Sequence, residues 1–189
     1  MIHTLMWEHP TKGSLSVVLR KPEIADLEAL YAQKNNPRVA RALGGFSLGY
    51  ARRDIEHWIE HHRTHPHEAL WAIIAGDAEG PCVGHVGLYE IDHRIRSAEF
   101  AVMVGDPDYW RKGIGREVTL FALRYGFEML NLNRIQLSVL GNNEAAQALY
   151  ASIGFHKEGV QRQAQYKDGE YIDVVLMSVL REEYEANAP

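Results

Sequence analysis

Three basic residues and two glycines stand together in the segment Trp110–Arg116, which reads WRKGIGR. Glycines let the backbone approach an anion closely, because no Cβ stands in the way. Arg111, Lys112 and Arg116 place positive charge at the same point of the chain. The first N–H groups of a helix have no internal partners, and the helix dipole is positive there. This combination predicts a site for a phosphate or pyrophosphate at the start of a helix.

The residues around this loop predict a strand, a turn and a helix. Phe100–Val104 is a short apolar run rich in valine, which is typical of a buried strand, and the turn cluster GDPD follows it. Beyond the loop, apolar residues recur with helical spacing at Val118, Phe121, Ala122 and Tyr125. Neither the Walker pattern nor a complete GxGxxG is present. From these residues alone, an anion site and an ordinary glycine turn with solvated bases both remain open.

Composition limits the kinds of partner that the chain can have. The 189 residues are 46% hydrophobic, which favours one globular domain with a substantial core. A net charge of −5 argues against a broad surface for nucleic acid or an anionic membrane. Cys82 is the only cysteine, which fits a reducing compartment, and no low-pKa setting for a nucleophile surrounds it. We therefore expect a cytoplasmic protein that binds neither nucleic acid nor membrane.

A metal site is the alternative interpretation of the histidines between residues 57 and 67. His57 and His61 are four residues apart on a helical pattern and could share one face. A solvated helix flank explains the same spacing, and neither a cysteine nor an HExxH arrangement accompanies the pair. The sequence therefore predicts no metal.

The order of the patterns predicts a single α+β domain. Strand patterns cover residues 15–19, 70–75, 83–91, 100–104, 134–140 and 171–180, with a further strand after Phe155. Tight polar turns give an antiparallel meander, whereas strand, helix and strand between residues 100 and 140 form a crossover with parallel neighbours. We expect a mixed, mostly antiparallel sheet of about seven strands flanked by about four helices. Residues 1–13 and 182–189 are expected to be peripheral tails.

Two segments together resemble one superfamily. WRKGIG at Trp110–Gly115 is similar to the acyl-CoA loop of GNAT acetyltransferases, Gln/Arg-x-x-Gly-x-Gly/Ala, with a tryptophan at the first position. NEAAQALYASIGF at Asn143–Phe155 resembles their second signature, NxxAxxLYxxxGF, which is longer and more specific. The surrounding sequence, from Ser14 to Tyr184, resembles the branch that contains ribosomal-protein N-terminal and spermidine acetyltransferases.

The resemblance implies transfer of an acetyl group from acetyl-CoA to a primary amine by direct attack on the thioester, with no metal. It implies that backbone N–H groups of the loop bind the pyrophosphate, that Met103 and Val104 bind the pantetheine as an added strand, and that Asn143 contacts the cosubstrate. One strand N–H could also stabilise the oxyanion. The implied cosubstrate-binding residues are Met103, Val104, Arg111, Lys112, Gly113, Ile114, Gly115, Arg116, Asn143 and Tyr150.

Two residues are candidates for proton chemistry. Tyr150 matches the motif tyrosine that gives the leaving thiolate a proton or a hydrogen bond, and a plain core aromatic is the alternative. Glu99 is the first candidate for the base that deprotonates the acceptor ammonium, because its apolar neighbours could raise its pKa. An exposed strand carboxylate is the alternative for Glu99, and Glu90 and Asp92 are further candidates.

The acceptor is the least determined part of the prediction. We expect a small polyamine-like amine or a protein N-terminal amine, and an amino sugar or aminoglycoside stays open. A non-catalytic acyl-CoA-binding module is the alternative from another class, although Tyr150 and Glu99 argue against it. The family resemblance also allows a homodimer. The acceptor pocket is expected among the first two helices and the last hairpin, which contain Phe46, Tyr50, Trp58, Gln165 and Tyr166.

Overall fold

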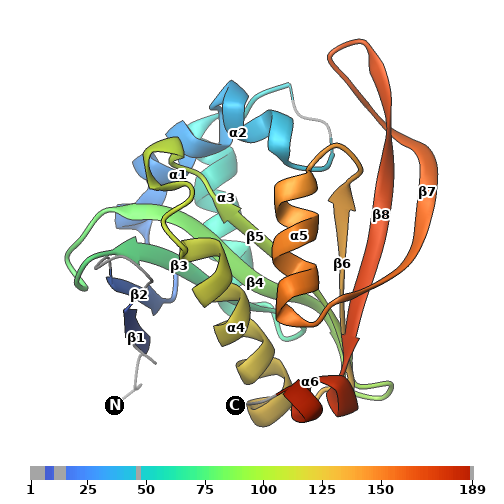
Figure 1. The fold of residues 1–189 in the computed structure, drawn as a ribbon. Helices are drawn as coiled ribbons and strands as arrows, with labels where there is room; N and C mark the ends of the chain where they lie inside the picture. The colour runs from blue at the N-terminus through green and yellow to red at the C-terminus, as the bar shows by residue number, and fades with distance from the viewer. Residues whose placement is uncertain (1–6, 11–15, 46–47, 188–189) are drawn as a thin grey trace.

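One eight-stranded sheet organises the protein (Figure 1). The computed structural model describes residues 7–10, 16–45 and 48–187. The order across the sheet is β1-β2-β3-β4-β5-β6-β8-β7, and all neighbours are antiparallel except the parallel pair β5 and β6. The strands are β1 (Trp7–Pro10), β2 (Ser16–Arg20), β3 (Ala69–Ala75), β4 (Cys82–Asp92), β5 (Ser97–Val104), β6 (Arg134–Leu140), β7 (His156–Lys167) and β8 (Glu170–Leu180).

Helices cover both faces of this sheet (Figure 1). One face carries α1 (Leu27–Lys34), which follows a short 3-10 turn, together with α2 (Pro37–Ala42) and α3 (Arg52–Thr64). The other face carries α4 (Ile114–Arg124), which continues into a π-helical turn at Tyr125–Met129, and α5 (Glu144–Ile153). The short helix α6 (Arg181–Asn187) follows β8. Within the described residues, no helix is both long enough and apolar enough to span a bilayer.

Two apolar cores lie on opposite faces of the sheet. The larger core lies under α4 and α5 and includes Phe100, Val118 and Tyr150. The smaller core lies under α1–α3 and includes Met103 and Ile55. Because side chains alternate along a strand, β5 contributes to both cores from successive positions. β5 is therefore the strand from which residues can reach either side of the sheet.

The contact between β5 and β6 is short. Ser97, Ala98 and Glu99 are opposite Arg134, Ile135 and Gln136, and the parallel pairing ends there. β5 runs on from that point to Val104 and β6 to Leu140 without a ladder between them. Beyond Glu99, the side of β5 that faces β6 therefore has no strand partner, although β5 is an inner strand of the sheet. We call this part of β5, from Phe100 to Val104, and the gap beside it the open stretch.

The predicted fold class is confirmed, with differences at three places. β1 adds an edge strand within residues 1–13, where a tail was expected, and residues 1–6 and 11–13 lie outside the described part. α2 is a further short helix that begins soon after α1 ends: the Asn36 side chain accepts from the Arg38 N–H at 2.9 Å, and proline suits the first helical position. Residues Arg181–Asn187 form α6, where a tail was expected from residue 182, and residues 188–189 lie outside the described part.

The packing of α6 has a clear physical basis. The Arg181 guanidinium donates to the Leu132 carbonyl at 2.7 Å, and the Tyr184 ring stacks on Phe127 with centroids 4.8 Å apart. The sequence from Arg181 onward is charged and has no apolar run, so it gives no sign of a packed helix. These tertiary contacts stabilise α6.

Candidate functional site

The glycine loop ends in a left-handed helix cap. Gly113 is the N-cap of α4 with φ +85°, and Arg111 also has positive φ, at +60°. The N–H groups of Arg116 and Glu117 both donate to the Gly113 carbonyl, at 3.0 and 3.2 Å. Within the described residues, no backbone acceptor pairs with the N–H groups between Lys112 and Gly115. The loop thus presents consecutive donors at the positive end of the helix, as binding of a pyrophosphate requires.

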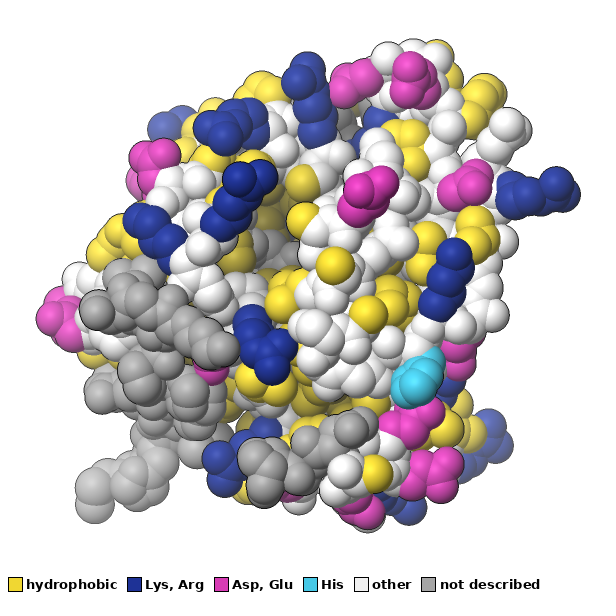
Figure 2. Space-filling model, in the orientation of Figure 1, with side chains coloured by type: hydrophobic (Ala, Val, Ile, Leu, Met, Phe, Trp, Pro, Cys, Tyr) yellow, Lys and Arg dark blue, Asp and Glu magenta, His cyan; other side chains and the backbone are white. Residues whose placement is uncertain are grey.

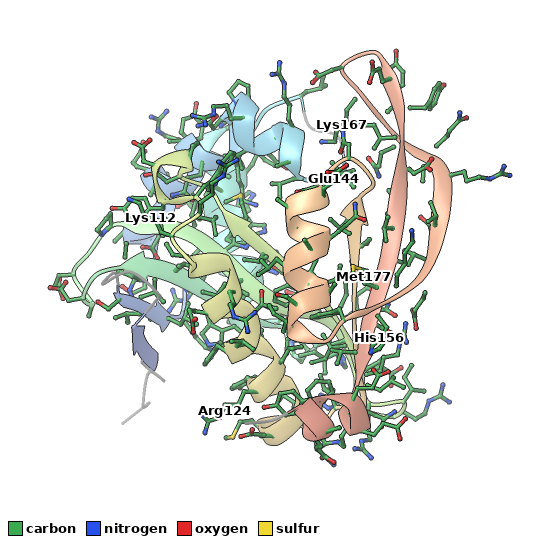
Figure 3. All side chains as sticks on the ribbon, in the orientation of Figure 1. Lys112, Arg124, Glu144, His156, Lys167 and Met177 are labelled. Atoms are coloured by element: carbon green, nitrogen blue, oxygen red, sulfur yellow. The ribbon has the colours of Figure 1, made fainter. Side chains whose placement is uncertain are left out.

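The three basic side chains of the loop differ in their surroundings. Arg111 and Lys112 are exposed, and the Lys112 Nζ lies 4.9 Å from the centre of the Tyr109 ring (Figure 3). Arg116 instead donates to the Ser152 hydroxyl of α5 at 3.1 Å, which ties α4 to α5. Figure 2 shows lysine and arginine side chains gathered on the upper part of the face where the loop and α2 lie in Figure 1. Arg111 and Lys112 are therefore the loop cations best placed to meet a phosphate.

Ile114 and Gly115 hold the loop against the core. The Ile114 side chain is fully buried among the residues under α4. A Cβ on Gly115 would lie 3.4 Å from the Leu149 Cδ2, an ordinary contact distance, so α4 packs directly on α5 at this level. These two residues position the N–H donors and do not themselves offer a side chain to a ligand.

The ladder geometry decides which residues of β5 face the open stretch. Gly84 is opposite Val104, and the Gly105 N–H donates to the Val83 carbonyl at 2.8 Å. In an antiparallel pair, bonded and non-bonded positions alternate, so the Met103 backbone points toward β4. The backbones of Val102 and Val104 point away from β4, toward the gap that β6 leaves. The Met103 backbone is thus paired with β4 and its side chain lies in the core under α1–α3, so Val102 and Val104 are the residues whose backbones face the gap.

Trp110 occupies the position where the general acyl-CoA loop motif has Gln or Arg. Its indole Nε1 donates to the Val104 carbonyl at 2.7 Å. The Arg38 guanidinium of α2 lies 5.3 Å from the centre of the Trp110 ring. Trp110 thus fixes the end of β5 against the loop, a role that the motif alone did not reveal.

Tyr150 is buried on the α4–α5 face. Its side chain is 9% exposed, and its ring packs edge to face on Phe100 with centroids 6.1 Å apart. No residue in the described part of the chain hydrogen-bonds to its hydroxyl. Burial raises the pKa of Tyr150 to about 12, so the phenol is neutral at physiological pH and can donate a hydrogen bond.

Glu99 lies where β5 and β6 separate. It is the last β5 residue in the parallel ladder, opposite Gln136. Tyr89 faces it from β4 and contacts the ring of His62 on α3, so Glu99 points to the α1–α3 side. Burial raises the pKa of Glu99, the negative charge of Glu90 raises it further, and a hydrogen bond with Ser138 acts in the opposite direction. Glu99 is thus a half-buried carboxylate with increased basicity.

The two other carboxylate candidates differ from Glu99. Asp92 accepts from the N–H groups of Arg94 and Ile95, at 2.8 and 3.0 Å, and these bonds lower its pKa. A carboxylate stabilised in this way is a poor base. Glu90 is exposed in a β-bulge with φ +51°, close enough to Glu99 to perturb it.

Asn143 caps a helix. Its Oδ1 accepts from the Ala146 N–H at 3.2 Å, at the start of α5, and its Nδ2 donates to the Ala42 carbonyl at the end of α2 at 3.3 Å. The side chain thus joins two elements that border the open stretch. Its contact with the cosubstrate stays a prediction.

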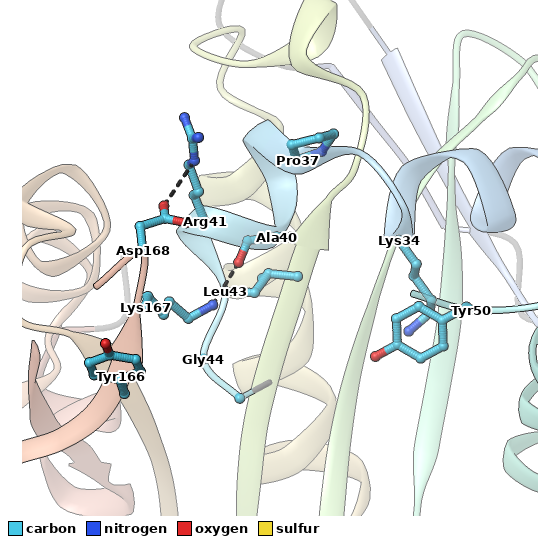
Figure 4. A pocket seen from close by; sticks show the side chains of 11 residues that line it. Lys34, Pro37, Ala40, Arg41, Leu43, Gly44, Tyr50, Tyr166, Lys167 and Asp168 are labelled. Atoms are coloured by element: carbon cyan, nitrogen blue, oxygen red, sulfur yellow. Dashed lines mark hydrogen bonds and ion pairs between the residues drawn. The ribbon is translucent and has the colours of Figure 1, made fainter. Parts of the chain in front are cut away.

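A cavity of about 440 Å³ lies between α2, the segment after it and the tip of the β7–β8 hairpin (Figure 4). Tyr50 and Tyr166, both predicted for the acceptor pocket, line it. Gln165 lies beside it, and its Oε1 accepts from the Gly45 N–H at 3.1 Å. Trp58 packs against the core behind the cavity, and Phe46 lies outside the described residues.

Cations dominate the lining of this cavity. The Lys34 Nζ lies 4.3 Å from the centre of the Trp58 ring and 5.6 Å from that of Tyr50, and burial lowers its pKa to about 8. Lys167 donates to the Ala40 carbonyl at 2.7 Å, and Arg41 pairs with Asp168 at 3.0 Å (Figure 4). The sequence did not mark Lys34, because a lysine in the last turn of a helix ordinarily complements the helix dipole.

Known proteins share both this sequence and this fold. Residues 16–156 match the acetyltransferase (GNAT) domain family. Spermidine N(1)-acetyltransferase of Escherichia coli is 30% identical over 172 residues, which cover 89% of this chain and 88% of that protein. The putative ribosomal N-acetyltransferase YdaF of Bacillus subtilis is 32% identical over 107 residues, which cover 57% of this chain and 58% of that protein.

Solved structures of one relative extend the comparison to three dimensions. The crystal structure of the Vibrio cholerae spermidine N-acetyltransferase in complex with CoA and spermine has a TM-score of 0.79 and 30% identity, covering 89% of this chain and 98% of that one. Another structure of that enzyme is dodecameric, with a TM-score of 0.76 and 29% identity, covering 92% and 98%. The sequence and the fold of this chain agree with those of these relatives. The chain belongs to the GNAT acetyltransferase family and is an acetyl-CoA-dependent N-acetyltransferase.

Proposed function

We propose that this enzyme acetylates a polyamine-like primary amine, with Glu99 as the base and Tyr150 as the hydrogen-bond donor to the leaving thiolate. The observation that carries the proposal is the position of Glu99 at the last rung of the β5–β6 ladder. Glu99 points to the α1–α3 side from there, and the next residue, Phe100, packs on Tyr150 on the α4–α5 side. The two groups thus flank the end of the open stretch from opposite faces of the sheet.

The open stretch and the loop together suit acetyl-CoA. The N–H groups from Lys112 to Gly115 are suited to the pyrophosphate, with Arg111 and Lys112 adding charge. The backbones of Val102 and Val104 face the gap, where an extended chain can add as a strand. With the Val104 carbonyl bonded to Trp110, the N–H groups of Val102 and Val104 are the donors left for the pantetheine. Acetyl-CoA then supplies the activated acetyl group at the end of the gap.

Glu99 would prepare the nucleophile. An amine attacks only after it loses its ammonium proton, and a carboxylate with a raised pKa accepts that proton more readily. The amine nitrogen then forms a bond to the acetyl carbonyl carbon, and the C–S bond breaks. The sulfur leaves with the electron pair of that bond, and the second amine proton balances the thiol product.

Tyr150 would stabilise the sulfur as it leaves. Its pKa of about 12 lies well above the roughly 8.5 of an ordinary thiol, so full proton transfer from the phenol to the thiolate is unfavourable. A hydrogen bond from the neutral phenol has no such cost and strengthens as charge develops on sulfur. Tyr150 therefore acts in this proposal mainly as a donor, and the second amine proton reaches the thiolate through solvent.

Charge around Glu99 supports a cationic acceptor. Glu90 and Glu99 are close enough for one to perturb the other, so an ammonium group between them would relieve the repulsion. The spermidine acetyltransferases of E. coli and V. cholerae, which match nearly the whole chain, act on amines of this class. A polyamine carries further ammonium groups that can pair with such carboxylates.

A protein N-terminal amine is a second candidate, favoured by the cavity. Lys34, Arg41 and Lys167 bring three cations to it, and Asp168 brings one carboxylate. This surplus repels the distal ammonium groups of a polyamine but attracts a peptide with acidic residues after its first position. An amino sugar with one amine would bring only its reacting ammonium to Glu90 and Glu99 and no acidic group to the cavity cations. A non-catalytic module would have no use for the Glu99 and Tyr150 arrangement.

An amine panel separates these acceptors. Thiol release from acetyl-CoA is measured with spermidine, with peptides that carry acidic or basic residues after a free N-terminus, and with glucosamine. The proposal expects the highest kcat/KM for spermidine. A preference for the acidic peptide would establish the second candidate, and tight acetyl-CoA binding without turnover on any amine would establish a binding module.

Two further properties complete the proposal. We place the enzyme in the cytoplasm, because its cysteine Cys82 is a buried thiol and its cosubstrate is produced inside cells. We also propose a homodimer as its smallest assembly, although the V. cholerae relative forms a dodecamer. Exposed Val160, Tyr166 and Tyr171 on the edge hairpin offer an apolar surface for it. Light scattering of the purified protein distinguishes these states.

A further inference from the structure

Imidazoles and a carboxylate gather at the C-terminal end of α3, away from the glycine loop and Tyr150. His61 and His62 lie in the last turn of α3, His65 is its C-cap, and Glu68 immediately precedes β3. The donor atoms of His61, His62 and Glu68 all lie within 4.8 Å of one another. His65 belongs to the same group, because its Nδ1 lies 3.7 Å from Glu68 Oε1 and its ring centroid 4.9 Å from that of His61.

The partial burial of His62 and Glu68, beside exposed His61, distinguishes this cluster from a solvated helix flank. The side chains of His62 and Glu68 are 13% and 12% exposed, and Glu68 Oε2 is in direct contact with His62 Nδ1. The Nδ1 of His65 is buried and has no hydrogen-bond partner in the described part of the chain. A buried imidazole nitrogen without a partner is costly, and a coordinate bond would satisfy it.

We propose that His61, His62, His65 and Glu68 bind a divalent transition-metal ion of the Zn²⁺ type. Imidazole nitrogen and carboxylate oxygen are common zinc ligands, whereas Ca²⁺ and Mg²⁺ prefer sites made of oxygen atoms. His61 and His65 are one helical turn apart and can both reach one ion. Glu68 enters from the segment after α3, and a bound ion would replace the direct contact between Glu68 Oε2 and His62 Nδ1. Imidazole binds metal only in its neutral form, so the ion displaces any proton held there.

The ligand set differs from the pair that the sequence suggested. His57 and His61 have the spacing of two ligands on one helix face, but the cluster forms at the other end of the helix and excludes His57. The missing information was tertiary, because the chain must turn after α3 to bring Glu68 back beside His62. The argument for these ligands uses neither the identity of the acceptor nor the roles of Glu99 and Tyr150.

Bound metal would fix the end of α3 behind the cavity. The His62 ring contacts Trp58 with centroids 4.8 Å apart, and Trp58 lies under Lys34 in the cavity wall. Metal binding would therefore restrict Trp58 as well as the turn into β3. We assign the ion a structural role and no step in the reaction.

Titration calorimetry with Zn²⁺ tests the proposal on protein from which any affinity tag has been removed and metal stripped by a chelator. We expect one equivalent to bind, with Co²⁺ in its place giving the visible absorption of a tetrahedral site. His61→Gln and Glu68→Gln should each weaken Zn²⁺ binding by at least about tenfold. His57→Gln on the same helix is the matched control, and so is His156→Gln, since exposed His156 lies 3.5 Å from a Glu183 oxygen. Both controls should leave the affinity unchanged.

Two results would overturn the site. One is wild-type protein that binds no stoichiometric Zn²⁺, and the other is equal loss of affinity in the His57 and His61 variants. Circular dichroism of the metal-free variants verifies that they fold. If Glu68→Gln does not fold, His65→Gln replaces it, since the His65 side chain is 34% exposed and less constrained by packing. Unchanged Zn²⁺ affinity in both His61→Gln and His65→Gln would equally refute the ligand set.

Discussion

The ring of Tyr150 packs edge to face on Phe100, with centroids 6.1 Å apart, and Phe100 is the first β5 residue beyond the ladder with β6. Glu99, the residue before it, points to the opposite face of the sheet. The proposed base, Glu99, and the ring on which the proposed donor Tyr150 packs, Phe100, are thus consecutive residues of β5. A thioester at the end of the gap would have its amine-facing side toward Glu99 and its sulfur within the environment of Tyr150.

Tyr150→Phe tests the donor. The substitution preserves the ring that packs on Phe100 and removes only a hydroxyl with no hydrogen-bond partner in the described residues, so folding should be unaffected. We expect kcat to fall by about 10²-fold, because the leaving thiolate loses its donor, with little change in the Kd of acetyl-CoA. Stopped-time assays of thiol release give kcat, and calorimetry gives Kd. Tyr184→Phe, which removes a hydroxyl that donates to Glu128 at 2.9 Å, should leave kcat unchanged. Equal kcat in wild type and Tyr150→Phe would exclude the donor role.

Glu99→Gln should change activity and stability in opposite directions. Loss of the base is expected to lower kcat by about 10²-fold, most strongly at low pH where the amine is protonated. The folded protein raises the pKa of Glu99, so burying the charged form disfavours folding, and this penalty appears as pH rises through the folded pKa. The glutamine variant should therefore unfold at a higher temperature than wild type at pH 7. Below the pKa of an unperturbed glutamate the difference should vanish.

Thermal unfolding of wild type and Glu99→Gln, followed by calorimetry from below the pKa of an unperturbed glutamate up to pH 7, measures this difference in stability. Asp92→Asn is the matched control, because backbone hydrogen bonds lower the pKa of Asp92 and its charged form is the favoured one. That variant should lose stability at pH 7 and keep its turnover. A Glu99→Gln enzyme with full activity at every pH would discard Glu99 as the base.

Gly113→Val should weaken acetyl-CoA binding. Gly113 has φ +85° at the N-cap of α4, a conformation that costs a β-branched residue about 1 kcal/mol or more, and a side chain there crowds the donors of the loop. Gly76→Val is the matched control, because Gly76 has φ +87° with open space around it, in the turn between β3 and β4. Both variants should lose comparable stability, and only Gly113→Val should raise the Kd of acetyl-CoA. If calorimetry gives both the same Kd, the loop is not the pyrophosphate site.

Lys34→Met should lower the KM of spermidine. The Lys34 ammonium lines the cavity and repels a cationic acceptor, and its pKa of about 8 keeps it mostly charged at pH 7. As pH rises through about 8 it becomes neutral, so the KM ratio of wild type to variant should decline toward unity. Peptides with acidic residues should show the reverse, a higher KM in the variant. Identical ratios at pH 7 and at about pH 9.5 would mean that the Lys34 charge does not act on the acceptor.

Asn143→Ala should destabilise the protein by about 1 kcal/mol, because α5 loses its N-cap and the link to Ala42. Asn143→Ser should recover most of that stability through its own hydroxyl. Urea unfolding measures both. If Asn143 also contacts the cosubstrate, acetyl-CoA should bind the serine variant more weakly than wild type, and equal affinities would limit Asn143 to capping.

The sequence predicted the central part of this structure well, because its signals are local. Phe100–Val104 formed a strand and the glycine loop led into α4, since apolar periodicity and glycine placement act within a few residues. The Asn143–Phe155 signature placed Tyr150 on an inward helix face. Whether the backbone of Met103 or of Val102 faces the gap depends instead on the register of β5 against β4. That register is a tertiary feature, which the local sequence of β5 does not reveal.

Features that depend on tertiary contacts escaped the sequence. Lys34 became a cavity residue only because Trp58 and Tyr50, from beyond α2, enclose it. The carboxylate candidates looked alike in the sequence, and only hydrogen bonds to Asp92 and the proximity of Glu90 to Glu99 separated them. In the sequence, Trp110 was only a departure from the motif. Its role became visible in the structure, where its indole N–H donates to the Val104 carbonyl.

The short ladder between β5 and β6 also affects how long the enzyme persists. In the part of the chain that the structure describes, only the strand pairs from Ser97–Arg134 to Glu99–Gln136 join β1–β5 to β6–β8 directly. An acyl-CoA that adds as a strand would hydrogen-bond to the part of β5 that β6 leaves unpaired. A ligand that binds only the folded state raises the free energy of unfolding by about 2.7 kcal/mol at a hundred times its Kd. A cell low in acetyl-CoA would then hold a looser protein, more open to proteolysis between these strands. Enzyme abundance would follow the supply of its own acetyl donor.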